Sequence, residues 1–223
     1  LSHKTAPIGV RERLAMRRDN LPEVLQRLLA QQGIGEAVVL STCNRVEVYA
    51  AAPGRGASDA DLAETARAVT AVLTSMGGEA VSPHLLRSHG NEAVLHLFRV
   101  AASHDSLVIG EPQILGQLKD AIEVARETRS LGVTLGRAMH RAVRVGKRVR
   151  SETAIGEGQV SVSSVAIDLA REIFGDLTGH TALLVGAAYQ AGALPLDAES
   201  IEAAITCRPT TVTRSSRALS RRG

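Results

Sequence analysis

Hydrophobic and polar residues follow two different spacings along the first 90 positions of the chain. Short runs that are apolar or alternate in polarity predict strands at residues 2–9, on each side of Cys43, and at 85–88. Apolar residues three and four positions apart predict helices over 21–32 and from Ser58, as the cap, to about Met76. This mixture of elements predicts a compact α+β sandwich.

From Asn91 the pattern becomes almost wholly helical. Asn91 is predicted to cap a helix that ends at 102, and Pro112 to open another that ends at about 128. Further helices are predicted over 133–151 and 161–174, and an apolar strand over 181–187 enters a glycine turn. The predicted fold class is therefore α+β: an N-terminal α/β sandwich with ferredoxin-like character, a helical segment with a long connecting helix, and a truncated Rossmann-like strand and turn at the C-terminus.

Composition narrows the class of protein. The 223 residues include 44% hydrophobic and 22% charged residues, an ordinary globular balance, and only 2% aromatic residues, so the core must be aliphatic. The net charge of +3 is compatible with an RNA partner without identifying one. No apolar run reaches the roughly 20 residues of a membrane span. Two cysteines suggest no disulfide framework, and we expect a cytoplasmic protein with free thiols. The chain lacks an initiator Met, so we expect a trimmed chain or a fragment.

The candidate nucleophile is Cys43, at the tight connection between the two predicted central strands. Thr42 and Asn44 can form hydrogen bonds there, and the guanidinium of Arg45 is expected to lower the thiol pKa and favour the thiolate. Arg45 can equally hold a substrate carboxylate in a bidentate fork. The alternative is a buried cysteine that packs as a small hydrophobic residue beside a solvated arginine.

A second candidate cluster joins two predicted helices around a glycine bend. Ser106, Glu111, Gln113 and Gln117 supply hydrogen-bonding groups there, and the two glutamines share a helix face. Such a cluster suits a small ligand with amine and carboxylate groups, and the alternative is an ordinary polar turn. His96, inside the preceding helix, is either a proton carrier near the thiol or a structural histidine.

Two further patterns point to phosphate chemistry. Arginines recur on one face of the 133–151 helix, where they either follow a phosphate backbone or are simply solvated. They are Arg137, Arg141, Arg144 and Arg148. The glycine turn after the last predicted strand stands where a dinucleotide fingerprint would begin, but Ala188 occupies the position of the second glycine. The candidate cofactor residues of this turn are Gly186, Ala187, Ala188, Tyr189, Gln190 and Ala191.

Several of these segments, in this order, resemble the glutamyl-tRNA reductase family, which acts in tetrapyrrole (porphyrin) biosynthesis. The opening residues 2–7 with Arg11 and Glu12 resemble its first motif, residues 41–45 its nucleophile motif, and 105–117 its glutamate-binding segment. Residues 147–153 and the 161–174 helix resemble its linking and spinal region. The resemblance extends to about Ala187 and is lost beyond it.

The resemblance implies roles for individual residues. Cys43 would attack the ester of glutamyl-tRNA and form a thioester, which NADPH would reduce to glutamate-1-semialdehyde, and His96 would assist catalysis. No metal, haem or flavin is expected. The glutamyl group would be bound by Thr42, Asn44, Arg45, Ser106, Glu111, Pro112, Gln113 and Gln117.

The resemblance also implies an organisation and partners. The expected division is a catalytic domain over 1–155, a spinal helix over 156–180, and a truncated or divergent start of an NADPH-binding domain over 181–223. The family is a homodimer whose dimerisation domain is expected to be missing here, and the downstream aminomutase is a possible partner. The alternatives are a non-catalytic tRNA-binding or regulatory fragment and a nonfunctional fragment.

Overall fold

The computed structural model describes residues 1–54, 56–157, 171–173 and 175. The chain divides into two compact units, Leu1–Ser164 and Val165–Gly223, and the elements described below belong to the first. Of the predicted helix at 161–174, only residues 171–173 are described. Outside the described residues lie Cys207 and the candidate cofactor residues 186–191. The domain division over 1–155, 156–180 and 181–223 therefore stays a prediction.

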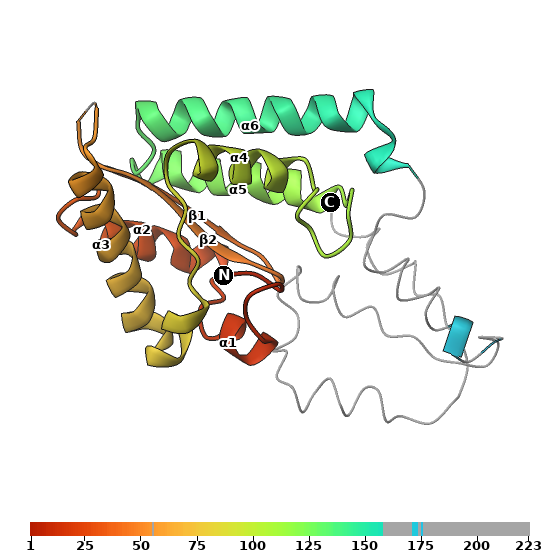
Figure 1. Ribbon diagram of the computed structural model, residues 1–223, viewed down its shortest axis with the longest axis horizontal. Coiled ribbons are helices and arrows are strands. Elements are labelled where there is room, and N and C mark those ends of the chain that lie inside the picture. The colour runs from red at the N-terminus through yellow and green to blue at the C-terminus, as the bar shows by residue number, and fades with distance from the viewer. Residues whose placement is uncertain (55, 158–170, 174, 176–223) are drawn as a thin grey trace, which may run out of the picture. The chain divides into compact units, whose positions relative to one another are not determined.

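The first unit is mixed and rich in helices (Figure 1). Its α-helices are α1 (Ile8–Glu12), α2 (Leu21–Leu29), α3 (Asp59–Gly77), α4 (Gly90–Ala101), α5 (Gln113–Glu127) and α6 (Val133–Glu152). Short 3-10 helices cover Arg18–Asn20, Glu79–His84 and Ala154–Gly156. The strands β1 (Glu36–Ser41) and β2 (Val46–Ala51) form one antiparallel hairpin in which Ser41 pairs with Val46 and Glu36 with Ala51.

The α+β class is confirmed, but the described residues form a two-stranded sheet rather than the four strands of a ferredoxin-like sandwich. The predicted strand at 2–9 is wrong, apart from an isolated bridge between Ser2 and Arg45. Thr5 and Ala6 donate backbone hydrogen bonds back to the carbonyl of Ser2, and α1 begins just after Pro7. Local turn bonds of this kind compete with strand pairing.

Two other local predictions also need correction. The predicted strand at 85–88 is wrong: the chain leaves a 3-10 helix there, Leu86 is 74% exposed, and no strand among the described residues pairs with this segment. Helix α4 begins at Gly90 with His89 as its cap, so Asn91 lies inside the first turn and is not the cap. Helix α2 ends at Leu29, earlier than position 32.

Helix α3 follows its predicted cap closely. The Ser58 side chain accepts from the backbone of Asp61, and the Asp61 carboxylate accepts from the backbone of Ser58, which forms a capping box. Helix α6 has a cap from a distant residue instead, since the Glu36 carboxylate accepts from the amides of Thr134 and Leu135 at 3.0 and 2.7 Å. A carboxylate at a helix N-terminus also complements the helix dipole.

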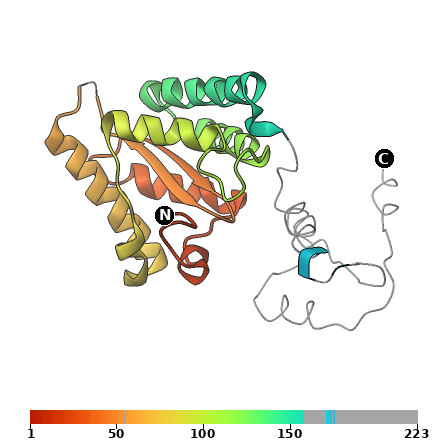
Figure 2. The same ribbon diagram turned by 45° about the vertical axis from the view of Figure 1, so that its right-hand side comes forward.

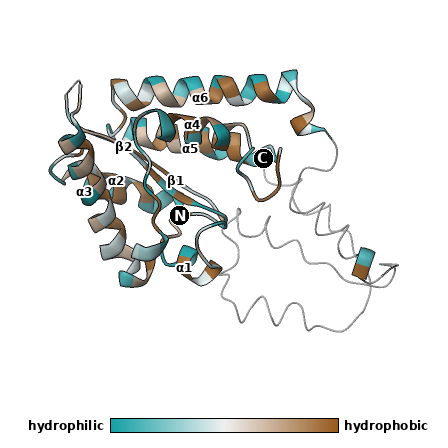
Figure 3. Cartoon of the chain, viewed as in Figure 1, coloured by the Kyte–Doolittle hydropathy of each residue, from teal (hydrophilic) through white to brown (hydrophobic). Residues whose placement is uncertain are grey.

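Helices α4, α5 and α6 pack against one another, and Figures 1 and 2 show them grouped together. Their apolar faces share one aliphatic core with β1 and α2. At the crossing of α4 and α6, Gly146 lies so close to Ala101 that a Cβ would sit 2.9 Å from the Ala101 carbonyl carbon. Hydrophilic and hydrophobic positions alternate along α6 in Figure 3, as expected for a helix that buries one face.

Candidate functional site

Cys43 lies at the tip of the β1–β2 hairpin and is exposed, so the alternative of a buried structural cysteine is wrong. The turn is closed by Thr42, whose amide donates to the carbonyl of Arg45 at 2.8 Å. Its hydroxyl accepts from the amides of Asn44 and Arg45 at 3.2 Å each. A rigid, hydrogen-bonded turn therefore holds the thiol outside the sheet.

The N-terminal segment braces this turn. The amide of His3 donates to the carbonyl of Asn44 at 2.8 Å. The Arg11 guanidinium donates to the carbonyl of Cys43 at 2.8 Å and to the side-chain oxygen of Asn44 at 3.2 Å. The N-terminal residues thus hold the turn through the backbone of His3 and the side chain of Arg11.

Three buried polar atoms without a hydrogen-bond partner occur in the described part of the chain: His3 Nδ1, Arg11 Nε and Ser106 Oγ. His3 and Arg11 hold the Cys43 turn, and Ser106 follows Asp105, which accepts from Arg45 beside that turn. Such atoms cost about 1–3 kcal/mol each and call for an explanation. Their grouping around an exposed thiol fits a site for a polar ligand.

The expected effect of Arg45 on the thiol is wrong. Partial desolvation and the Glu111 carboxylate raise the pKa of Cys43 above its ordinary value of 9.0, while a backbone hydrogen bond and Arg11 oppose them. Arg45 is not among the groups that shift this pKa, because its guanidinium points to other partners. The nearby cation that favours the thiolate is Arg11.

Arg45 joins the hairpin to the loop after α4. Its guanidinium is 2% exposed and donates to Glu47 Oε1 at 2.6 Å and to Asp105 Oδ2 at 3.3 Å, as well as to the Asp105 carbonyl. Burial lowers the pKa of Arg45, but the Glu47 and Asp105 carboxylates outweigh burial and raise it. Lys4 forms a further ion pair with Asp105. The bidentate fork predicted for a substrate therefore already contacts two carboxylates of the protein.

His96 belongs to the same network, since its Nε2 lies 2.9 Å from Glu47 Oε1. Burial raises the pKa of Glu47, but the hydrogen bond with His96 and the charge of Arg45 outweigh it and lower that pKa to about 2. The hydrogen bond with Glu47 raises the pKa of His96, although burial opposes it. Tyr49 donates to the other Glu47 oxygen. Sequence reasoning missed Glu47 and Tyr49, whose only signal was their alternation along β2.

The second candidate cluster lies in the loop before α5, and Glu111 comes near enough to Cys43 to raise its pKa. The loop is held at the Glu111 carbonyl, which accepts from Ser103 Oγ at 2.7 Å and from Arg150 at 2.9 Å. Ser103 has a φ of 59°, an unusual conformation for a residue with a side chain.

The remaining members of this cluster continue from the loop into α5. Pro112 directly precedes the helix, Gln113 is exposed in its first turn, and Gln117 is half-buried one turn later. Among the described residues of this cluster, only Glu111 shifts the pKa of Cys43, and the grouping of the others with the thiol stays a prediction. No group of three or more metal-ligating side chains, and no helix able to cross a membrane, occurs among the described residues.

Fold and site together define a mixed α+β domain that presents a thiol among unpaired polar groups. The family model for the N-terminal domain of glutamyl-tRNA(Glu) reductase matches residues 1–153. The chain belongs to the glutamyl-tRNA reductase family.

Its relatives share both sequence and fold. A glutamyl-tRNA reductase of Sorangium cellulosum is 65% identical over 207 residues, covering 86% of this chain and 39% of that protein. One of Geobacter sulfurreducens is 47% identical over 190 residues, covering 84% of this chain and 42% of that protein. The structure of the Methanopyrus kandleri enzyme matches with a TM-score of 0.59 at 32% identity, covering 81% of this chain and 40% of that one. The chain therefore spans about two fifths of the length of these relatives.

Proposed function

We propose that this chain accepts the glutamyl group of glutamyl-tRNA on Cys43. The observation that carries the proposal is the exposed thiol at the hairpin tip, surrounded by the unpaired polar atoms of His3, Arg11 and Ser106. An aminoacyl ester needs an accessible nucleophile, and its amino and carboxylate groups need polar partners. The names of the relatives supply the substrate class.

In the proposed step, the Cys43 thiol loses its proton to solvent and the sulfur attacks the ester carbonyl carbon. A C–S bond forms, the ester C–O bond breaks, and the ribose oxygen of the tRNA leaves and takes up a proton. Because the pKa of Cys43 is raised, the thiolate is the minor form at neutral pH, and acylation should accelerate with rising pH. The positive charge of Arg11 beside the turn favours the thiolate and opposes part of this effect.

We assign the binding of the glutamyl group to the turn and the loop that face each other. The candidate binding residues are Thr42, Asn44, Ser106, Glu111, Pro112, Gln113 and Gln117, to which we add His3 and Arg11, while Arg45 would position the loop through Glu47 and Asp105. His96 is proposed to act through Glu47, which holds it in the charged network of Arg45.

NADPH, when bound, supplies the hydride that converts a thioester to an aldehyde, as the family resemblance implies. The described residues contain two antiparallel strands and no parallel strand–helix–strand unit of the kind that binds a dinucleotide. The candidate residues 186–191 lie outside the described residues. A homodimer, the aminomutase partner and a cytoplasmic location stay predictions.

The test is incubation of the full chain with labelled glutamyl-tRNA, followed by acid quenching and mass spectrometry of peptides. We expect a glutamyl adduct on Cys43 that disappears in the Cys43→Ser variant and persists in the matched Cys207→Ser variant. Tight tRNA binding without any adduct would instead support the alternative of a non-catalytic tRNA-binding or regulatory module.

A further inference from the structure

The exposed face of α6 is strongly basic. Residues 128–151 contain seven Lys and Arg residues and no Asp or Glu. The arginines Arg137, Arg141 and Arg144 recur along the exposed face of α6, while its buried face packs on the core. Positive charge of this density on one side of one helix is a feature of surfaces that bind polyanions.

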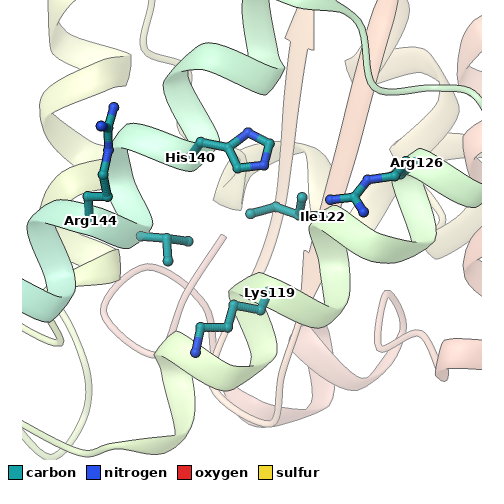
Figure 4. Close-up of a pocket in the computed structure, with 6 residues that line it drawn as sticks. Lys119, Ile122, Arg126, His140 and Arg144 are labelled. Carbon is teal, nitrogen blue, oxygen red and sulfur yellow. The ribbon is translucent and has the colours of Figure 1, made fainter.

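This face is hollowed where α6 meets α5. One pocket is lined by Lys119, Ile122, Arg126, His140, Val143 and Arg144. Figure 4 shows Lys119, Ile122 and Arg126 on α5 and His140 and Arg144 on α6 around it. A second pocket shares His140 and Arg144 and extends along α6 to Arg137 and Gly132. We call these two adjoining pockets the basic groove.

The cations of the basic groove have no carboxylate partners within the described part of the chain. Lys119 and Arg126 lie on one side of α5, three and four residues on either side of Ile122. Two of the three acidic residues of α5, Asp120 and Glu123, instead approach Arg18, at 3.8 and 3.6 Å, and the third, Glu127, is exposed at the end of the helix. The two carboxylates of α5 that form ion pairs therefore pair with Arg18, and the cations that line the groove form no ion pair with the described residues.

The axis of α6, along which the groove lies, points towards the loop that borders the thiol. Helix α6 rises about 1.5 Å per residue, so Arg137 and Arg144 lie roughly 10 Å apart along its axis, and Arg148, one turn further, is paired with Glu152. Its last turn carries Arg150, which donates to the carbonyl of Glu111 at 2.9 Å. Glu111 in turn raises the pKa of Cys43. The basic face therefore runs along α6 towards the loop that borders the candidate nucleophile.

We infer that the basic groove binds the phosphate backbone of the tRNA substrate and directs its aminoacylated end towards Cys43. This inference rests on the proposed function for the identity of the RNA. An anionic membrane fits less well, because an interfacial helix needs a free apolar face. Leu135, Met139 and Ala142 of α6 are buried in the core instead.

The test is the binding of uncharged tRNA to the full chain at several salt concentrations, since this assay needs no thioester chemistry. The variant Arg141→Gln/Arg144→Gln should raise the dissociation constant on the order of tenfold and lower the salt slope by about 1 to 2. Arg67→Gln/Arg87→Gln removes the same charge from exposed sites away from the groove and should bind as the wild type does.

Further measurements separate the possible failures. An unchanged salt slope, or an equal loss in the Arg67/Arg87 control, would overturn the inference. The inference would also be overturned if the Arg141→Gln/Arg144→Gln variant lost binding to phosphatidylserine vesicles while its binding to tRNA persisted. If the Arg141/Arg144 variant fails to fold, Lys119→Gln/Arg137→Gln tests the same groove from both helices. A Cys43→Ser protein that forms no adduct yet binds tRNA through the groove would refute the proposed chemistry and leave this surface standing.

Discussion

Replacing Glu47 with Gln tests the charged network that joins the hairpin to α4 and to the loop after it. The Glu47 side chain is 11% exposed and contacts Arg45 at 2.6 Å and His96 at 2.9 Å. Gln preserves the size of the side chain and one accepting oxygen but removes the charge. The Arg45 guanidinium, 2% exposed, would then keep Asp105 as its carboxylate partner.

The size of the effect follows from the Glu47 pKa, which falls from 4.5 to about 2 on folding. One pKa unit corresponds to about 1.4 kcal/mol, so the ionised carboxylate contributes about 3 kcal/mol to the free energy of unfolding. Because the folded pKa is depressed, this contribution is present above pH 4.5 and is lost as the pH falls through about 2. His96 has a raised pKa, so its share is present below 6.5 and is lost as the pH rises through its folded value.

The assay is urea unfolding of the wild type and of Glu47→Gln, followed by far-UV circular dichroism at several pH values. We expect a difference of about 3 kcal/mol near pH 5.5 and less than half of that at pH 3. Glu12→Gln is the matched control, because Glu12 is exposed and forms no ion pair with any residue that the structure describes. A Glu47→Gln difference below about 0.5 kcal/mol near pH 5.5, or one of equal size at pH 3, would refute the reasoning.

Three further predictions concern packing and the thiol. Gly146→Ala should destabilise the protein by about 1–3 kcal/mol because the new Cβ meets the backbone of α4, whereas Gly116→Ala on α5 has open space and should not. Equal melting temperatures would contradict this close helix contact. The rate of Cys43 alkylation by iodoacetamide should titrate above the ordinary thiol pKa of 9.0, and a midpoint below it would contradict the raised pKa. Arg45→Lys keeps the charge but loses the planar fork between two carboxylates, so both stability and Cys43 acylation should fall. Wild-type values of both would remove Arg45 from the site.

The sequence predicted elements whose determinants are local. The apolar spacing of α5 and α6 and the capping box of α3 sit within single segments, and the structure confirms these helices. The strand predicted at 2–9 failed because the turn between Ser2 and Thr5 satisfies the backbone locally. Alternation of polarity over a few residues does not distinguish an edge strand from a hydrogen-bonded turn.

At the site, position along the chain could be predicted and side-chain direction could not. Cys43 was placed correctly at the hairpin tip. The direction of Arg45 depends on Asp105, 60 residues further along the chain, and the brace on the turn depends on Arg11, 32 residues earlier. Contacts over such separations are set by packing between elements, so the sequence predicts an influence of Arg45 on the thiol pKa that the structure assigns to Arg11 instead.

Helix α6 connects the basic groove to the loop that borders the Cys43 thiol. Its buried face fixes it closely against α4 at Gly146, and its last turn holds the Glu111 carbonyl through Arg150. If the proposed polyanion continues from the groove along α6 to Arg150, it reaches the loop that borders Cys43.

We accordingly expect uncharged tRNA to slow the alkylation of Cys43 with a half-effect at its dissociation constant. The slowing should be lost in Arg141→Gln/Arg144→Gln and kept in the Arg67/Arg87 control. An RNA backbone that follows α6 to its last turn must end where it covers or displaces the loop that contains Glu111. If saturating tRNA left the alkylation rate unchanged, the groove and the thiol would therefore bind their ligands independently.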